Sequence, residues 1–165
     1  MYYAILNDTT LSIFALLVVA AAYQDVKSFT IPNIFSLSIL ILYPAFVLSA
    51  AGEVNWLFAL GIASGSLIVG FALFAFKLCG GGDAKLFAAV SLWAGPDLMV
   101  EFTLLMGITG GIIAVSLWLH HRVSLMVPFL PQGTITGSET FAKKPMPYGL
   151  AIAVGAVYVA FTLLR

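Results

Sequence analysis

Charged residues are scarce in this chain. Only 8% of its 165 residues are charged, whereas 62% are hydrophobic. Soluble domains carry roughly 25% charged and 45–50% apolar residues. Together with a mean hydropathy of +1.09, this composition excludes an ordinary soluble domain and indicates an integral membrane protein. The formal net charge is zero. The chain therefore has no excess of basic residues that would indicate nucleic acid, and no excess of either sign that would indicate a charged partner.

Cysteine is nearly absent as well. Cys79 is the only one, which excludes a disulfide within the chain and a zinc site built from several cysteines. The first ten residues, MYYAILNDTT, contain Asp8 but no Lys or Arg, unlike the positively charged start of a secretory signal. We therefore expect the first apolar stretch to be retained as a helix.

Long apolar runs occupy most of the chain, and a bilayer-spanning helix needs about 20 such residues. We predict an all-α, polytopic membrane protein, one domain over residues 1–165, with six transmembrane helices. These are expected at residues 10–24, 34–51, 56–78, 83–93, 98–119 and 148–164. The fourth is short, and Pro44 predicts a kink in the second. The loop at 120–147 is rich in Pro, Gly, Ser and Thr, which predicts little regular structure.

The distribution of Lys and Arg predicts the orientation. With six helices, one side of the membrane carries Lys27, Lys77, Lys85, Arg122, Lys143 and Lys144. The other side has only Arg165, and its loops carry Asp8, Glu53 and Asp97. By the positive-inside rule, both termini are predicted outside and the three basic loops in the cytoplasm.

This topology brings two carboxylates to the cytoplasmic side. Asp25 ends the first helix, in AAYQDVKSFTIPN, and Asp83 opens the fourth, in GGGDAKL. An ionisable residue at a helix centre in the membrane costs about 2.5–3.5 kcal/mol on insertion scales and usually faces the bundle interior. Each also has a simpler interpretation. Asp83 can be an N-terminal helix cap, and Asp25 can be a loop charge paired with Lys27.

The neighbouring residues favour a joint chemical role. Gly80, Gly81 and Gly82 place no side chain before Asp83 and allow another backbone to approach closely; we interpret them as clearance for a peptide substrate. Two nearby carboxylates do not both ionise easily, so one keeps its proton. The ionised carboxylate then activates water while the protonated one polarises a carbonyl, which is aspartyl proteolysis.

Three motifs carry a family resemblance. They are Asp25 with the IPN at 31–33, GGGDAK at 80–85, and PMPYG at 145–149. With them, the chain resembles the type IV prepilin peptidase family, membrane aspartyl proteases of the G-x-G-D class, in the short form of tight-adherence (Flp-type) pilus systems. The resemblance implies that Asp25 and Asp83 are catalytic. It also implies cleavage of the leader of prepilin or pseudopilin precursors at the cytoplasmic face of the bacterial inner membrane.

Further residues in these motifs are expected to shape the site. They are Pro32, Asn33, Gly80, Gly81, Gly82, Lys85, Pro147, Tyr148 and Gly149. Pro32 disfavours helical geometry at the residue before it and so sets an extended entry into the second helix. Lys85 either anchors the topology or engages substrate. PMPYG is predicted to place the start of the last helix near the site.

Longer family members add a cytoplasmic domain with paired Cys-x-x-Cys motifs. Because this chain has only Cys79, we expect no zinc, no other cofactor, and peptidase activity without N-methyltransferase activity. The expected partners are the precursor and the lipid bilayer. Two other function classes stay open. A small ion-coupled transporter predicts more polar residues at mid-membrane, and a structural subunit of a pilus or secretion machine predicts that both aspartates tolerate Asn.

Overall fold

The computed structural model describes residues 2–50, 54–126 and 148–165, apart from the side chains of His121 and residues 123–126. Over these residues the chain is helical and contains no strand, which confirms the all-α prediction. The elements are α1 (Tyr2–Ser28), α2 (Asn33–Ser49), α3 (Trp56–Ala75), α4 (Gly81–Met126) and α5 (Tyr148–Leu163). Pro44 lies inside α2 without ending it.

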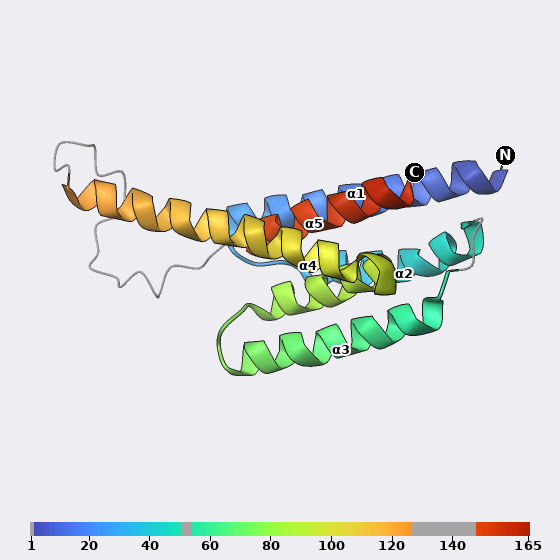
Figure 1. The fold of residues 1–165 in the computed structure, drawn as a ribbon, viewed down its shortest axis with the longest axis horizontal. Helices are drawn as coiled ribbons and strands as arrows, with labels where there is room; N and C mark the ends of the chain where they lie inside the picture. Colours follow the sequence, from blue (N-terminus) through green and yellow to red (C-terminus); the bar gives the residue numbers. More distant parts are fainter. Residues whose placement is uncertain (1, 51–53, 127–147) are drawn as a thin grey trace.

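Helix α4 is broken at Gly95. This residue has φ 56° and ψ −165°, a backbone region that glycine enters without the steric cost of a Cβ. Pro96 follows and cannot donate a backbone hydrogen bond. Figure 1 shows α4 turning back on itself here. The predicted fourth and fifth helices are therefore its two parts, called the first arm (residues 81–94) and the second arm (residues 96–126).

The second arm extends further than predicted. It continues to Met126, whereas the loop was expected to begin at residue 120. Residues 120–126, HHRVSLM, contain neither proline nor glycine, so nothing in them interrupts the helix. The prediction of an irregular loop is wrong for these seven positions, and the rest of the predicted loop, 127–147, lies outside the described residues.

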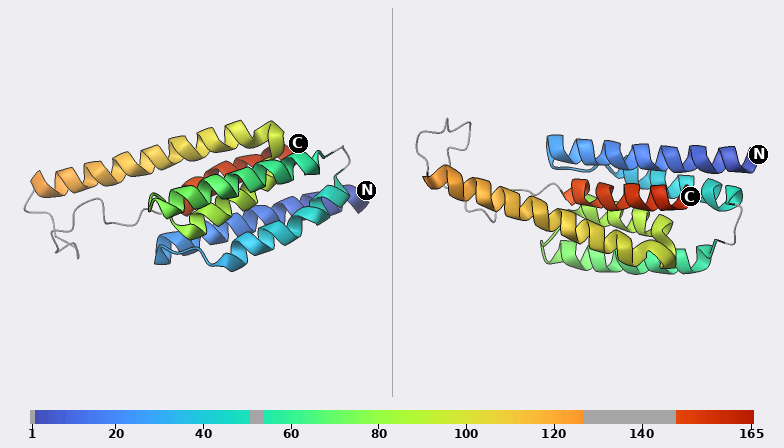
Figure 2. Two further views of the ribbon diagram at one scale, coloured as in Figure 1. Left: turned by 90° about the horizontal axis from the view of Figure 1, so that it is seen from below. Right: turned by 45° about the horizontal axis from the view of Figure 1, so that its top comes forward.

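The helices form a bundle around the first arm of α4. Helices α2 and α3 each pack against α4 and hardly touch one another. Helix α5 lies between α1 and α4 and packs against both (Figures 1 and 2). Successive segments run in opposite directions along the bundle (Figure 1). This arrangement leaves a groove between α2 and α3, and the first arm of α4 forms its floor.

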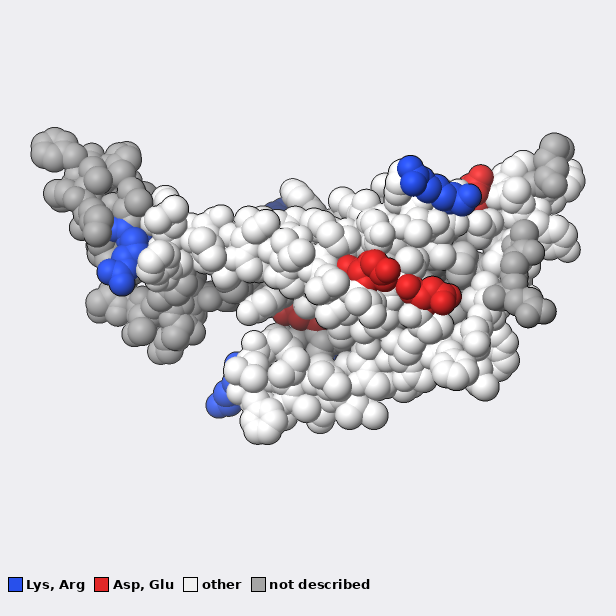
Figure 3. Space-filling view, viewed as in Figure 1, with Lys and Arg blue, Asp and Glu red and all other residues white. Residues whose placement is uncertain are grey.

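The outer surface is suited to lipid. Three described segments are long and apolar enough to cross a membrane, namely Tyr2–Ser28, Trp56–Ala75 and Gly81–His120, while α2 and α5 are apolar but shorter. Large hydrophobic side chains are exposed along every helix, and charged groups are sparse on the face in Figure 3. The chain is therefore a membrane protein. Six spans and external termini stay predictions.

An aromatic cluster ties three helices together. The rings of Phe14 and Trp93 stack with centroids 4.3 Å apart, and Tyr43 and Phe46 pack against the same indole. Indole Nε1 of Trp93 donates to the carbonyl oxygen of Ile39 at 3.1 Å, so the buried indole N–H has a hydrogen-bond partner. The cluster fixes α1, α2 and the first arm of α4 against one another.

Candidate active site

Polar groups gather where four helix ends meet. The end of α1, the start of α2, the turn between α3 and α4, and the start of α5 all lie at one end of the bundle (Figure 1). Asp25 lies in the last turns of α1, and Asp83 lies in the first turn of α4. The charge of Asp25 acts on the carboxyl group of Asp83. The structure therefore brings the two aspartates within electrostatic reach of each other.

Asp25 is buried and caps a different helix. Its side chain is 4% exposed, and its Oδ2 accepts a hydrogen bond from the Gly149 N–H at 2.8 Å. Gly149 is the second residue of α5, where amide groups have no partner inside the helix and the positive end of the helix dipole favours an anion. The interpretation of Asp25 as a loop charge paired with Lys27 is wrong, because Asp25 lies inside α1 and points inward.

Gly149 leaves room for this contact. A Cβ at this position would lie 2.9 Å from both the Cβ and the Oδ2 of Asp25, closer than such atoms approach. The start of α5 therefore lies against Asp25, as PMPYG was expected to arrange. Tyr148 is the half-buried first residue of α5, and Pro147 lies outside the described residues.

Asp83 bonds within its own turn. It is the third residue of α4, which begins at Gly81, and its Oδ2 accepts from the Gly80 N–H at 3.2 Å. A carboxylate at the third helical position that bonds back to the amide of the capping residue forms half of a capping box. The Asp83 carboxylate therefore does accept a backbone N–H at the start of α4, as the helix-cap interpretation expects. Asp83 is only half-buried.

The three glycines make room for the chain itself. A Cβ on Gly80 would lie 2.7 Å from Oδ2 of Asp83, and one on Gly82 would lie 2.9 Å from the carbonyl oxygen of Ile31. A Cβ on Gly81 would meet an aromatic ring of α3 at 3.3 Å. On the side where a Cβ would lie, groups of the protein itself occupy the space; clearance for a substrate backbone stays a prediction.

The IPN segment joins the starts of α2 and α4. Ile31 is buried with its backbone against Gly82, and Pro32 holds the extended conformation before α2, with φ −59° and ψ 139°. The Lys85 Nζ donates to Oδ1 of Asn33 at 3.0 Å, across 52 positions of sequence. Lys85 therefore links two helix starts beside Asp83, a contact that a topology anchor alone does not need.

Two non-glycine residues in left-handed conformations shape this end of the bundle. Phe29, with φ 52°, ends α1, and its N–H donates to the Asp25 carbonyl at 2.7 Å. Lys77, with φ 59°, ends α3, where the Leu78 N–H donates to the Leu73 carbonyl at 2.9 Å. This conformation costs a non-glycine residue roughly 1–2 kcal/mol. Sequence reasoning missed both turns, because neither phenylalanine nor lysine signals such a conformation.

Cys79 lies directly before the glycines. Its Sγ donates to the Gly70 carbonyl oxygen at 3.7 Å. Burial, and to a smaller extent the charge of Asp83, raises the pKa of the Cys79 thiol, so it is a weak nucleophile at neutral pH. In the described part of the chain, no group of three or more His, Cys, Asp or Glu side chains lies together as a possible metal site.

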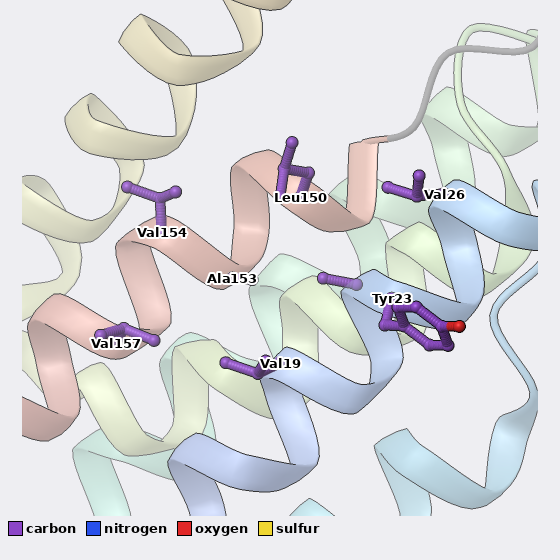
Figure 4. Close-up of a pocket in the computed structure, with 8 residues that line it drawn as sticks. Val19, Tyr23, Val26, Leu150, Ala153, Val154 and Val157 are labelled. Carbon is purple, nitrogen blue, oxygen red and sulfur yellow. The ribbon is translucent and has the colours of Figure 1, made fainter.

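Two grooves flank the aspartates. The α1–α5 groove, about 490 Å³, is lined by apolar side chains that include Val19, Tyr23, Val26, Leu150, Val154 and Val157 (Figure 4). The α2–α3 groove, about 460 Å³, is floored by the first arm of α4. Its lining includes Asn33, Ser36, Leu40, Ala63, Leu67 and Lys85.

Comparison with protein families gives a match to the type IV leader peptidase family over residues 12–115, more than half of the chain. The chain belongs to this family. This match confirms the resemblance to prepilin peptidases. As a member of a peptidase family with long apolar helices, the protein is a membrane-embedded peptidase. Its matched range includes Asp25 and Asp83 and ends before α5. Comparisons with curated proteins and with solved structures returned no match.

Proposed function

We propose that this chain is an intramembrane aspartyl endopeptidase. It removes the N-terminal leader of prepilin-like precursors at the cytoplasmic face of the bacterial inner membrane. The supporting observation is the meeting of Asp25, from the end of α1, with Asp83, from the start of α4, within electrostatic reach. Membership of the type IV leader peptidase family gives that carboxylate pair a reaction to perform.

The pair works as a shared acid and base. One carboxylate is ionised and takes a proton from water, so that the water oxygen bonds to the scissile carbonyl carbon. The other is protonated and hydrogen-bonds the carbonyl oxygen, which carries the developing negative charge. The carbon–nitrogen bond then breaks as the leaving amine takes a proton. The single proton belongs to the pair rather than to one residue.

The substrate in this proposal has its leader in the cytoplasm and its apolar segment in the bilayer. The concentration of Lys and Arg in three predicted loops supports placing the aspartate end of the bundle on the cytoplasmic side. The proposal also includes six membrane crossings with both termini outside. It assigns the protein to the short tight-adherence form, with peptidase activity and no N-methyltransferase activity.

Co-expression with a prepilin-like precursor tests it, with leader removal followed by gel shift and mass spectrometry. Asp25→Asn and Asp83→Asn should each reduce processing by at least about 100-fold, because the acid–base pair is lost. Asn keeps an oxygen that accepts the Gly149 or Gly80 amide, so the fold is preserved. Asp97→Asn and Glu101→Gln, on the second arm of α4 and exposed, are matched controls. Wild-type processing by either single Asp25 or Asp83 variant, at equal protein level, contradicts the mechanism.

A further inference from the structure

The α2–α3 groove has walls of matched length. Its lining runs from position 33 to 40 on α2, from 60 to 67 on α3 and from 85 to 92 on α4. At 1.5 Å per residue, each wall is about 10 Å long, or two helical turns. Ala88 and Ala89 form part of its floor and Ala63 part of one wall; such small residues let another helix approach closely within a membrane.

The groove has a charged group at one end only; apart from the asparagine beside it, the other polar lining residues are serines. Asn33 and Lys85 begin the lining on α2 and α4 and are hydrogen-bonded to each other. The opposite end is lined by Leu40, Leu60 and Leu92. The polar end is the one beside the carboxylate pair, because Lys85 lies two residues after Asp83. A segment lying in the groove would thus have its polar end at the aspartates and its apolar end in the membrane interior.

Ser36 is a second feature of the groove that suits a bound helix. It lines the groove, and its Oγ is buried with no hydrogen-bond partner among the described residues. Buried polar atoms are rarely left unsatisfied. A helix that enters the bilayer has unpaired N–H groups in its first turn, and these need acceptors where water is absent. Ser36 lies one turn into the groove, where such a first turn would lie.

The α1–α5 groove offers none of these features. Apart from Tyr23, whose hydroxyl points away from α5 in Figure 4, its lining is aliphatic. Its described lining has no cation and no buried unsatisfied hydroxyl to set the register of a bound segment. Its shape and composition suit lipid acyl chains.

We propose that the α2–α3 groove holds the first turns of the apolar helix of the leader-bearing precursor, with the leader junction at the end marked by Asn33 and Lys85. This inference rests on the proposed function and specifies how its substrate is bound. The bond to be cleaved then lies just outside the groove, beside Asp83. Ser36 accepts an amide of the bound helix once its side chain rotates toward the groove, and the alanines let the helix lie close to the first arm of α4.

The groove is tested by filling it. Ala63→Phe puts a ring into the groove, whereas Ala72→Phe adds the same ring to an exposed position of α3 outside it. With a purified precursor that carries a short basic leader and an apolar segment, Ala63→Phe should raise KM at least tenfold with little change in kcat. Ala72→Phe should cleave like the wild type. Equal kinetics for both variants overturn the proposal.

A second measurement is photo-crosslinking in an Asp83→Asn background. It does not use Ala63→Phe, so it tests the proposal even if that variant fails to fold. Benzoylphenylalanine at Leu67, in the α2–α3 groove, should crosslink the precursor, whereas the same probe at Val154, in the α1–α5 groove, should crosslink lipid. Precursor captured only at Val154, or lipid alone at Leu67, overturns the groove proposal. If the wild-type protein does not cleave the precursor at all, the proposed function itself fails, which separates the two outcomes.

Discussion

Asp25 and Asp83 meet at one end of the bundle, but the protein positions them in different ways. Asp25 is buried, and its backbone partner, Gly149, is 124 positions away. Asp83 is half-buried and bonds Gly80, three positions before it. The position of Asp25 therefore depends on how α1 and α5 pack, whereas that of Asp83 depends on one local turn. Perturbations of tertiary packing and of local turn geometry should affect the two carboxylates separately.

Among substitutions that keep both carboxylates, the largest effect is expected from Gly149→Ala. The new Cβ would overlap the Asp25 side chain, at 2.9 Å from its Cβ and Oδ2, so either the carboxylate or α5 must move. A displacement of about 1 Å can cost on the order of 100-fold in rate, and we expect a loss of that size in leader cleavage. Gly61→Ala is the control, since a Cβ there has nothing within 4 Å. Full activity of Gly149→Ala would show that the Asp25 position does not depend on this contact.

Gly82→Ala should come next and act on the Asp83 side. Its Cβ would press on the Ile31 carbonyl oxygen at 2.9 Å, a backbone atom held in place by Pro32. Overpacking of this kind costs typically 1–3 kcal/mol. Gly81→Ala is the matched comparison, because its Cβ would meet only a ring edge at 3.3 Å, which can move. Thermal unfolding in detergent should show a larger loss for Gly82→Ala; equal losses would mean that the Ile31 contact does not matter.

A smaller effect of opposite sign is expected from Lys77→Gly. Lys77 ends α3 with φ 59°, and glycine adopts this conformation without the cost of roughly 1–2 kcal/mol that other residues bear. Its greater freedom in the unfolded chain offsets part of that gain. We expect a net stabilisation of up to about 1 kcal/mol in chemical unfolding experiments, with cleavage unchanged. Destabilisation would show that the lysine side chain contributes more to this turn than its backbone conformation costs.

The mildest test uses Cys79 as a reporter of charge at Asp83. The charge of Asp83 contributes to the raised pKa of the thiol, so removing it in Asp83→Asn should lower that pKa and increase the thiolate fraction at fixed pH. Alkylation of Cys79 should become measurably faster in Asp83→Asn than in the wild type. Asp25→Asn should change it less, and a reversed order would contradict the assignment of Asp83 as the nearer charge.

Much of the fold was predictable because long apolar runs have few alternatives in a membrane. The separate apolar runs at 83–93 and 98–119 predicted the break that divides α4, and the motifs around Asp25 and Asp83 predicted which carboxylates lie together. The sequence analysis missed the extension of α4 beyond residue 119, because the apolar run that predicts the fifth helix ends there. A helix can continue into a polar region when no residue interrupts it.

The contacts that hold the site were harder to predict. The bond between Asp25 and Gly149 joins residues 124 positions apart, and no local pattern encodes which amide a buried carboxylate will reach. The three glycines signalled a close approach, but the sequence could not say that Ile31, rather than a substrate, is what approaches Gly82. Left-handed geometry at Phe29 and Lys77 comes from the demands of the surrounding turns, and their residue types do not indicate it.

The bond between Asp25 and Gly149 also orders events during synthesis. The ribosome makes both aspartates early, and a nascent chain that has emerged through α4 already carries both carboxylates. Asp25 gains its amide donor only after α5, the last of the described helices, has inserted beside α1. A chain released before Tyr148 would keep both carboxylates while lacking the group that holds one of them in place. The hydrogen bond that holds Asp25 is thus coupled to the insertion of α5.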